Sequence, residues 1–188
     1  MRFTAPSEGP EEGSRDALRE AARSYVALNG PVALEDLARW WRGYSPAQAG
    51  KLIAELDEEV EEADVEGTAA FMLAGHGDLA AALEPPKSVR LLPAFDQYVV
   101  AASGHAHELL PEGTDRARVY RPQGWLTPVL SVDGLIRGLW RHERKGRRLV
   151  VKVEPLAKLP KWVRAGVEQE AELLAGFLGG DLELTFHT

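Results

Sequence analysis

The spacing of the apolar residues changes at Pro85 and Pro86, within the segment HGDLAAALEPPK. Upstream of these prolines the apolar residues recur at helical spacing. Downstream, β-rich runs flank the pairs Asp133-Gly134 and Lys145-Gly146, which is the sequence form of a tight hairpin. Because Pro does not continue a helix, the change predicts a linker between two units. The predicted parts are an N-terminal lead (1–13), a helical unit (14–75), a linker (76–88) and a β-rich unit with a C-terminal helix (89–188).

Two helices are predicted first in the helical unit. The segment SRDALREAARSYVALNG places apolar residues from Ala17 to Leu28 on one stripe, with Ser14 able to cap its start and Gly30 able to end it. The segment VALEDLARWW then forms a short second helix. Both helices are amphipathic, so we expect each to bury one face.

A third helix and a hairpin complete this unit. Ser45 is a suitable N-cap, Pro46 suits the first helical position, and Gln48 completes a capping box. Beyond this helix, VEEADVEG and AAFMLAG indicate two short strands joined around Gly67. Three helices followed by a hairpin are the order of a winged helix, whose third helix usually enters the major groove of DNA.

The β-rich unit ends in a helix and a last strand. Its hairpins predict a small antiparallel sheet or barrel, followed by the helix KWVRAGVEQEAELLAGFLGG and the strand LELTFH. The predicted fold class is therefore α+β: a winged helix, then a small antiparallel β-barrel with a C-terminal helix. We expect the tryptophans in the core, with stacking of Trp125 on a base as the alternative for that residue.

The composition excludes several classes of protein. The chain has no cysteine, which excludes disulfides, thiolate metal sites and cysteine nucleophiles. No apolar run reaches the roughly 18 residues of a membrane span, and the N-terminus lacks the apolar core of a signal peptide, so we expect a cytoplasmic protein without a membrane partner. The formal net charge of −7 opposes nonspecific attraction to nucleic acid, so any DNA contact must come from a local basic patch.

Four separated segments together resemble one family. They are YVALNGPVALEDLARWW, LLPAFDQYVVA, RVYRPQGWLTPVLSVDGLIRGLW and EQEAELLAGFLGGDLEL. They are similar to the bacterial winged-helix proteins that include the AlkZ and YcaQ DNA glycosylases, and the match runs from about Phe3 to the C-terminus. The resemblance implies tandem winged helices plus a β-barrel, and DNA repair by removal of bulky alkylated bases, including those of interstrand crosslinks.

The chain departs from this family in its catalytic element. The resemblance implies a Gln-x-Gln or Gln-x-Asp motif, but no glutamine here has Gln or Asp two places on; the glutamines are Gln48, Gln97, Gln123 and Gln169. Because family members are commonly about twice as long, we expect a DNA-binding protein that lacks the catalytic half, with no catalytic residue and no cofactor. Two alternatives stay open: an active glycosylase or a fragment of one, and a protein-interaction winged helix.

The main candidate for a DNA contact is the basic segment RGLWRHERKGRRLVVK. On a hairpin that turns at Lys145-Gly146, its cations project where they can reach phosphates, and Arg suits phosphate geometry. A charged, solvated hairpin tip is the other interpretation. The candidate residues on this hairpin are Arg141, Arg144, Lys145, Arg147 and Arg148. Arg116, Arg118 and Arg121 either extend the patch or form the solvent face of a strand.

The third helix offers a weaker candidate. Gln48 and Lys51 lie on its expected solvent face, where they can reach base edges or phosphates. A run of acids follows at the helix end and wing: Glu55, Asp57, Glu58, Glu59, Glu61, Glu62, Asp64 and Glu66. Carboxylates repel phosphates over the Debye length of roughly 8 Å, which favours a structural or protein-binding role for this helix.

No metal site is predicted. His105 and His107 in GHAHE are of a residue type that binds zinc. Two ligands are too few for a zinc site, however, and the sequence spacing indicates no third ligand. Asp96 in AFDQY is a possible catalytic carboxylate by residue type, and we favour a turn-capping role for it.

Overall fold

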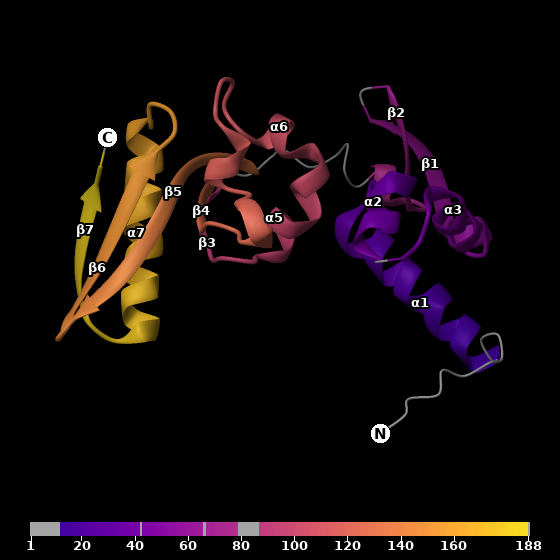
Figure 1. Cartoon of the computed structure of the whole chain (residues 1–188), viewed down its shortest axis with the longest axis horizontal. Coiled ribbons are helices and arrows are strands. Elements are labelled where there is room, and N and C mark those ends of the chain that lie inside the picture. The colour runs from indigo at the N-terminus through magenta and orange to yellow at the C-terminus, as the bar shows by residue number, and fades with distance from the viewer. Residues whose placement is uncertain (1–11, 42, 66, 79–86, 188) are drawn as a thin grey trace. The chain divides into compact units, whose positions relative to one another are not determined.

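The computed structural model describes residues 12–41, 43–65, 67–78 and 87–187 (Figure 1). Most of the predicted N-terminal lead, the centre of the predicted linker and Glu66 lie outside these residues. The chain divides into two compact units, Met1–Leu83 and Glu84–Thr188. Each unit is described on its own below.

The first unit begins with three helices and a hairpin, and residues 76–78 after the hairpin are also helical. Its elements are α1 (Glu12–Asn29), α2 (Leu34–Trp40), α3 (Pro46–Ala54), the 3-10 turn η1 (Asp57–Glu59), β1 (Val60–Val65) and β2 (Thr68–Leu73). Strands β1 and β2 pair antiparallel. This is the predicted winged-helix order. Its core gathers residues from all three helices, including Val26, Leu37 and Ile53.

Local capping explains where α3 begins. The Ser45 hydroxyl accepts a hydrogen bond from the Gln48 amide at 3.3 Å, and the Gln48 side-chain oxygen accepts one from the Ser45 amide at 2.9 Å. The predicted capping box is therefore present. The prediction for α1 was less accurate, because the helix already starts at Glu12 and Ser14 lies inside it. Leu28 is 84% exposed, because the buried stripe runs through Ala22, Tyr25 and Val26 instead.

The second unit is a five-stranded sheet with helices. Its elements are β3 (Val89–Leu92), α5 (Gln97–Ala101), η2 (Ala102–His105), α6 (Ala106–Leu109), η3 (Arg116–Arg118), η4 (Pro122–Gly124), β4 (Val129–Val132), β5 (Leu135–Lys145), β6 (Arg148–Pro155), α7 (Lys161–Leu178) and β7 (Asp181–Phe186). The strand order is β3-β4-β5-β6-β7. The presence of helices together with a mainly antiparallel sheet confirms the α+β class.

Strand β7 pairs with its neighbour in a different direction from the other described strands of this sheet. The pairs from β3 to β6 are antiparallel, but β6 and β7 are parallel. The helix α7 connects these two strands, and parallel neighbours require such a crossover. Figure 1 shows α7 lying along the sheet formed by β5, β6 and β7. The core beneath α7 includes Val151, Val153, Val163 and Val167.

Both predicted hairpins are present, but only the first turn lies at the predicted residue pair. Val132 pairs with Leu135, so Asp133 and Gly134 form a two-residue turn, and their φ values are 50° and 79°. Positive φ at both central positions is required by the type I′ turn and explains the Asp-Gly pair. At the other hairpin, Lys145 belongs to β5 and pairs with Arg148, so the turn residues are Gly146 and Arg147, one position later than the predicted Lys145-Gly146 pair. Gly146 has a φ of 63°.

Candidate nucleic-acid interface

The β5–β6 hairpin separates apolar and charged side chains onto two faces. Across the hairpin, Trp140 pairs with Val153 and Arg141 pairs with Lys152. Because side chains alternate along a strand, Trp140, Val153 and Val151 face the core beneath α7. Arg141 and Lys152 face the opposite side. The charged side chains that share this outer face are Arg141, Glu143, Lys145, Arg148 and Lys152.

Acidic residues neutralise several of these cations. Glu143 contacts the ammonium of Lys145 at 3.0 Å and that of Lys152 at 2.7 Å. Arg148 contacts Glu183 of β7 at 3.1 Å. The outer face is therefore a network of exposed ion pairs, and its excess of positive charge is smaller than the hairpin sequence indicates.

Arg144 has a structural partner at the end of α7. Its guanidinium donates to the carbonyl oxygen of Leu178 at 2.6 Å and also to that of Gly179. These carbonyls close α7, where a cation satisfies unpaired acceptors and the negative end of the helix dipole. The structure therefore gives this predicted DNA contact a role in joining the hairpin to α7.

Two hairpin arginines have no such partner. Within the described residues, Arg141 and Arg147 make no ion pair and no side-chain hydrogen bond. Both are exposed, and Arg147 is, with Gly146, one of the two turn residues of the hairpin. Arg147 and its exposed neighbours Lys145 and Arg148 form a group that we call the hairpin tip.

The three upstream arginines do not form the solvent face of a strand. Arg116 and Arg118 lie in the 3-10 turn η3, and Arg121 follows it. Arg116 lies over the Tyr120 ring at 4.6 Å, and Arg118 contacts Glu154 of β6 at 2.5 Å. Arg121 donates to the Thr127 hydroxyl at 3.0 Å.

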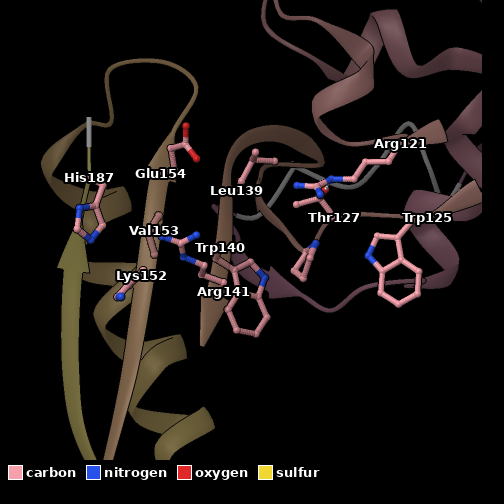
Figure 2. A pocket seen from close by; sticks show the side chains of 11 residues that line it. Arg121, Trp125, Thr127, Leu139, Trp140, Arg141, Lys152, Val153, Glu154 and His187 are labelled. Carbon is pink, nitrogen blue, oxygen red and sulfur yellow. Dashed lines mark hydrogen bonds between the residues drawn. The ribbon is translucent and has the colours of Figure 1, made fainter. Parts of the chain in front are cut away.

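Arg121 and Arg141 both line a cleft of about 250 Å³ in the second unit. Figure 2 shows Lys152, Glu154 and His187 on one side of the cleft and Arg121, Thr127 and Trp125 on the other. The lining residues are Arg121, Trp125, Thr127, Pro128, Leu139, Trp140, Arg141, Lys152, Val153, Glu154 and His187. Three lining side chains are cationic and only Glu154 is a carboxylate, so the cleft is suited to an anion.

Trp125 is exposed rather than buried, so its predicted place in the core is wrong, and the same holds for Trp40 and Trp162, which are 44% and 36% exposed. The Trp125 side chain is 58% exposed, whereas Trp140 is 6% exposed. The Arg121 amide donates to the Trp125 carbonyl at 2.8 Å, which closes a turn containing Gln123 and Gly124 at φ 65° and 76°. The Pro-Gln-Gly sequence before Trp125 is a turn signal, and it is the feature from which this exposure can be predicted.

The candidate residues on α3 lie in the first unit. Lys51 is exposed, as expected. Gln48 is also exposed, but its side-chain oxygen accepts hydrogen bonds from both the amide and the hydroxyl of Ser45, at 2.9 and 3.0 Å. Among the neighbouring acids, Glu59 pairs with Arg23 at 2.7 Å and with Arg19, which joins η1 to α1.

The remaining candidates have structural explanations. Asp96 caps α5 and accepts a hydrogen bond from the Tyr98 amide at 3.0 Å. In the described part of the chain, no three His, Asp or Glu side chains gather where they could hold a metal ion, and the side chain of His105 lies outside that part. None of the described helices is long and apolar enough to cross a membrane.

Glu143 is expected to titrate well below its usual range. Hydrogen bonds from Lys152 and then Lys145 lower the pKa of its carboxyl from 4.5 to about 2. A lowered pKa in the folded state means that these pairs stabilise the fold above pH 4.5 and lose this effect as the pH falls through about 2. NMR titration of the Glu143 carboxyl carbon should give a midpoint near 2. Lys152→Ala should raise it more than Lys145→Ala, and a midpoint near 4.5 in the unmodified chain would contradict the network.

Comparison with known proteins identifies the family. The model of the family described as DNA glycosylase AlkZ-like matches residues 2–177. An interstrand DNA cross-link repair glycosylase from Streptomyces sahachiroi is 35% identical over 184 residues, which cover 93% of this chain and 48% of that protein. The solved structure of the Streptomyces sahachiroi DNA glycosylase AlkZ matches with a TM-score of 0.73 and 30% identity, over 95% of this chain and 47% of that chain. The chain thus spans about half the length of these relatives. Its sequence and fold place it in the AlkZ-like DNA glycosylase family.

Proposed function

We propose that this chain binds DNA through the β5–β6 hairpin and that it does not excise bases on its own. The observation that carries the proposal is the hairpin tip, where Arg147 has no partner among the described residues and lies between the exposed cations Lys145 and Arg148. In a relative of enzymes that repair DNA, an exposed group of cations at the end of a hairpin is suited to phosphate.

The ion pairs of the hairpin permit this role. Lys145 and Arg148 contact Glu143 and Glu183 at the surface, where water and salt screen ion pairs and leave them weak. Phosphate can therefore replace a carboxylate as the partner of either cation at small cost. Arg147 needs no such exchange. We accordingly assign the principal DNA contact to the hairpin tip, which Arg144 of β5 supports by joining the hairpin to the end of α7.

The proposed absence of base excision rests on the sequence. None of the glutamines of the chain has Gln or Asp two positions later, so the catalytic spacing implied by the family resemblance is absent. Among the described residues that line the cleft, Glu154 is the one acid, and it is paired with Arg118 at 2.5 Å. A carboxylate engaged in this way is poorly placed to activate water.

Binding and excision can be measured on the same samples. We expect the chain to bind a plain duplex and a duplex with one bulky N7-alkylpurine, in both cases more weakly as salt is raised. No abasic sites should form above a no-protein control. Release of the modified base would favour the active-glycosylase alternative, and lack of salt-sensitive DNA binding would favour the protein-interaction alternative.

A further inference from the structure

The cleft between the hairpin and the Arg121–Trp125 turn contains an unusual pair of like charges. Arg141 and Lys152 lie directly opposite each other on the same face of β5 and β6. Like charges in such cross-strand positions destabilise a sheet unless an anion lies nearby. Lys152 contacts Glu143 at 2.7 Å, but Arg141 has no acidic partner among the described residues. The positive charge of Arg141 at the cleft is therefore not balanced by any described acid.

A third cation lies across the cleft in a fixed position. The Arg121 guanidinium donates to the Thr127 hydroxyl at 3.0 Å, and its backbone amide donates to the Trp125 carbonyl at 2.8 Å. Both bonds hold Arg121 in place before any ligand arrives. Arg121 and Arg141 both line the cleft, and their planar donors suit a phosphate bound between them.

Trp125 gives the cleft an aromatic surface. Its ring meets the Phe95 ring nearly at right angles, with centroids 5.2 Å apart and an interplanar angle of 85°. This contact and the closed turn hold the indole in place while more than half of its surface remains open to solvent. An exposed indole held in this way is a platform on which a base can stack.

We propose that this cleft binds a single unstacked nucleotide of DNA, with the base on Trp125 and a phosphate between Arg121 and Arg141. The proposal rests on the proposed DNA-binding function and adds a substrate class to it. A volume of about 250 Å³ lies below the usual range of pockets for drug-sized ligands, so the cleft has room for no more than one nucleotide. A base inside a duplex offers no free face for stacking, so the cleft selects nucleotides that have left the stack.

The experiment compares a fully paired duplex with the same duplex carrying one extra unpaired adenine. Fluorescence anisotropy should show that the chain binds the bulged duplex about tenfold more tightly, which is the scale of one base–aromatic stack. Trp125→Ala should abolish this preference and leave the affinity for the paired duplex unchanged. Trp125→Phe should retain most of the preference, because a ring remains.

Two further variants test the position of the site. Trp162→Ala removes another partly exposed tryptophan of the same unit, outside the cleft lining, and should keep the preference. Arg141→Gln should weaken binding to the bulged duplex more than binding to the paired one. In competition at equal ionic strength, deoxyadenosine monophosphate should displace the bulged duplex better than inorganic phosphate does.

Each outcome separates the two proposals. Equal affinity for bulged and paired duplexes, or a preference that survives Trp125→Ala, overturns the nucleotide site while DNA binding stands. Equal competition by inorganic phosphate shows an anion site without base recognition and also overturns it. Failure to bind either duplex defeats the DNA-binding function itself, and displacement of a fluorescent acidic peptide from the cleft would then assign these cations to a protein partner.

Discussion

Replacing Lys145, Arg147 and Arg148 by Gln should reduce duplex binding by at least about tenfold at low salt, because phosphate contacts dominate nonspecific affinity. Each cation that neutralises a phosphate contributes about −0.9 to the slope of log K against log salt, so this variant should flatten the slope by about 2.7. Fluorescence anisotropy with a short duplex across a salt series measures both quantities. Arg144 is left intact, because its bonds to Leu178 and Gly179 support the end of α7 and its loss would disturb the fold.

Two control variants make this result specific. Changing Lys158, Lys161 and Arg164 to Gln removes the same charge from the region where α7 begins, at the opposite end of the helix from the carbonyls that Arg144 contacts. This variant should keep most of the affinity and of the slope. Replacing Gln48 and Lys51 on α3 by Ala should also have a small effect. If the α3 variant loses binding while the hairpin variant keeps it, the winged helix reads DNA and the assignment is wrong.

Trp140→Ala should destabilise the second unit by about 3–5 kcal/mol, which is the usual cost of truncating a buried tryptophan. Its side chain is 6% exposed and packs in the core beneath α7. The indole nitrogen also donates to the Leu92 carbonyl at 2.8 Å, which joins β5 to β3 across β4. Urea unfolding followed by circular dichroism gives the change in the free energy of unfolding.

Trp125→Ala is the matched control for this variant. The same atoms are removed from the same unit, but at a side chain that is 58% exposed, so the cost should stay below about 1 kcal/mol. Trp140→Phe should lie between the two, because it keeps part of the packing and leaves the Leu92 carbonyl without its donor. Equal destabilisation by Trp140→Ala and Trp125→Ala would show that Trp140 is not a core residue.

Local signals in the sequence were sufficient to predict most of the fold. The capping box at Ser45 and Gln48 starts α3 as predicted, and Asp133-Gly134 forms the predicted turn with positive φ at both residues. These features depend on neighbours within about three positions, so their physical causes are contained in short segments. The predicted order of three helices, a hairpin, a sheet and a C-terminal helix follows from such signals and is present, but the helices α5 and α6 and the 3-10 turns between β3 and β4 were not predicted.

Contacts between residues far apart in the sequence determine which cations of the candidate interface are paired. No local sequence pattern predicts these contacts. Arg148 meets Glu183 and Arg144 meets Leu178 because α7 returns the chain to place β7 beside β6. The same parallel pairing explains why part of the basic hairpin is neutralised. Trp125 was predicted in the core from its residue type, yet the closed turn before it holds the ring at the surface. Charge and residue type are therefore properties of the sequence. Tertiary packing alone leaves Arg141 and Arg147 without an acidic partner among the described residues and forms the cleft beside Trp125, because both depend on which acids and loops the fold brings near.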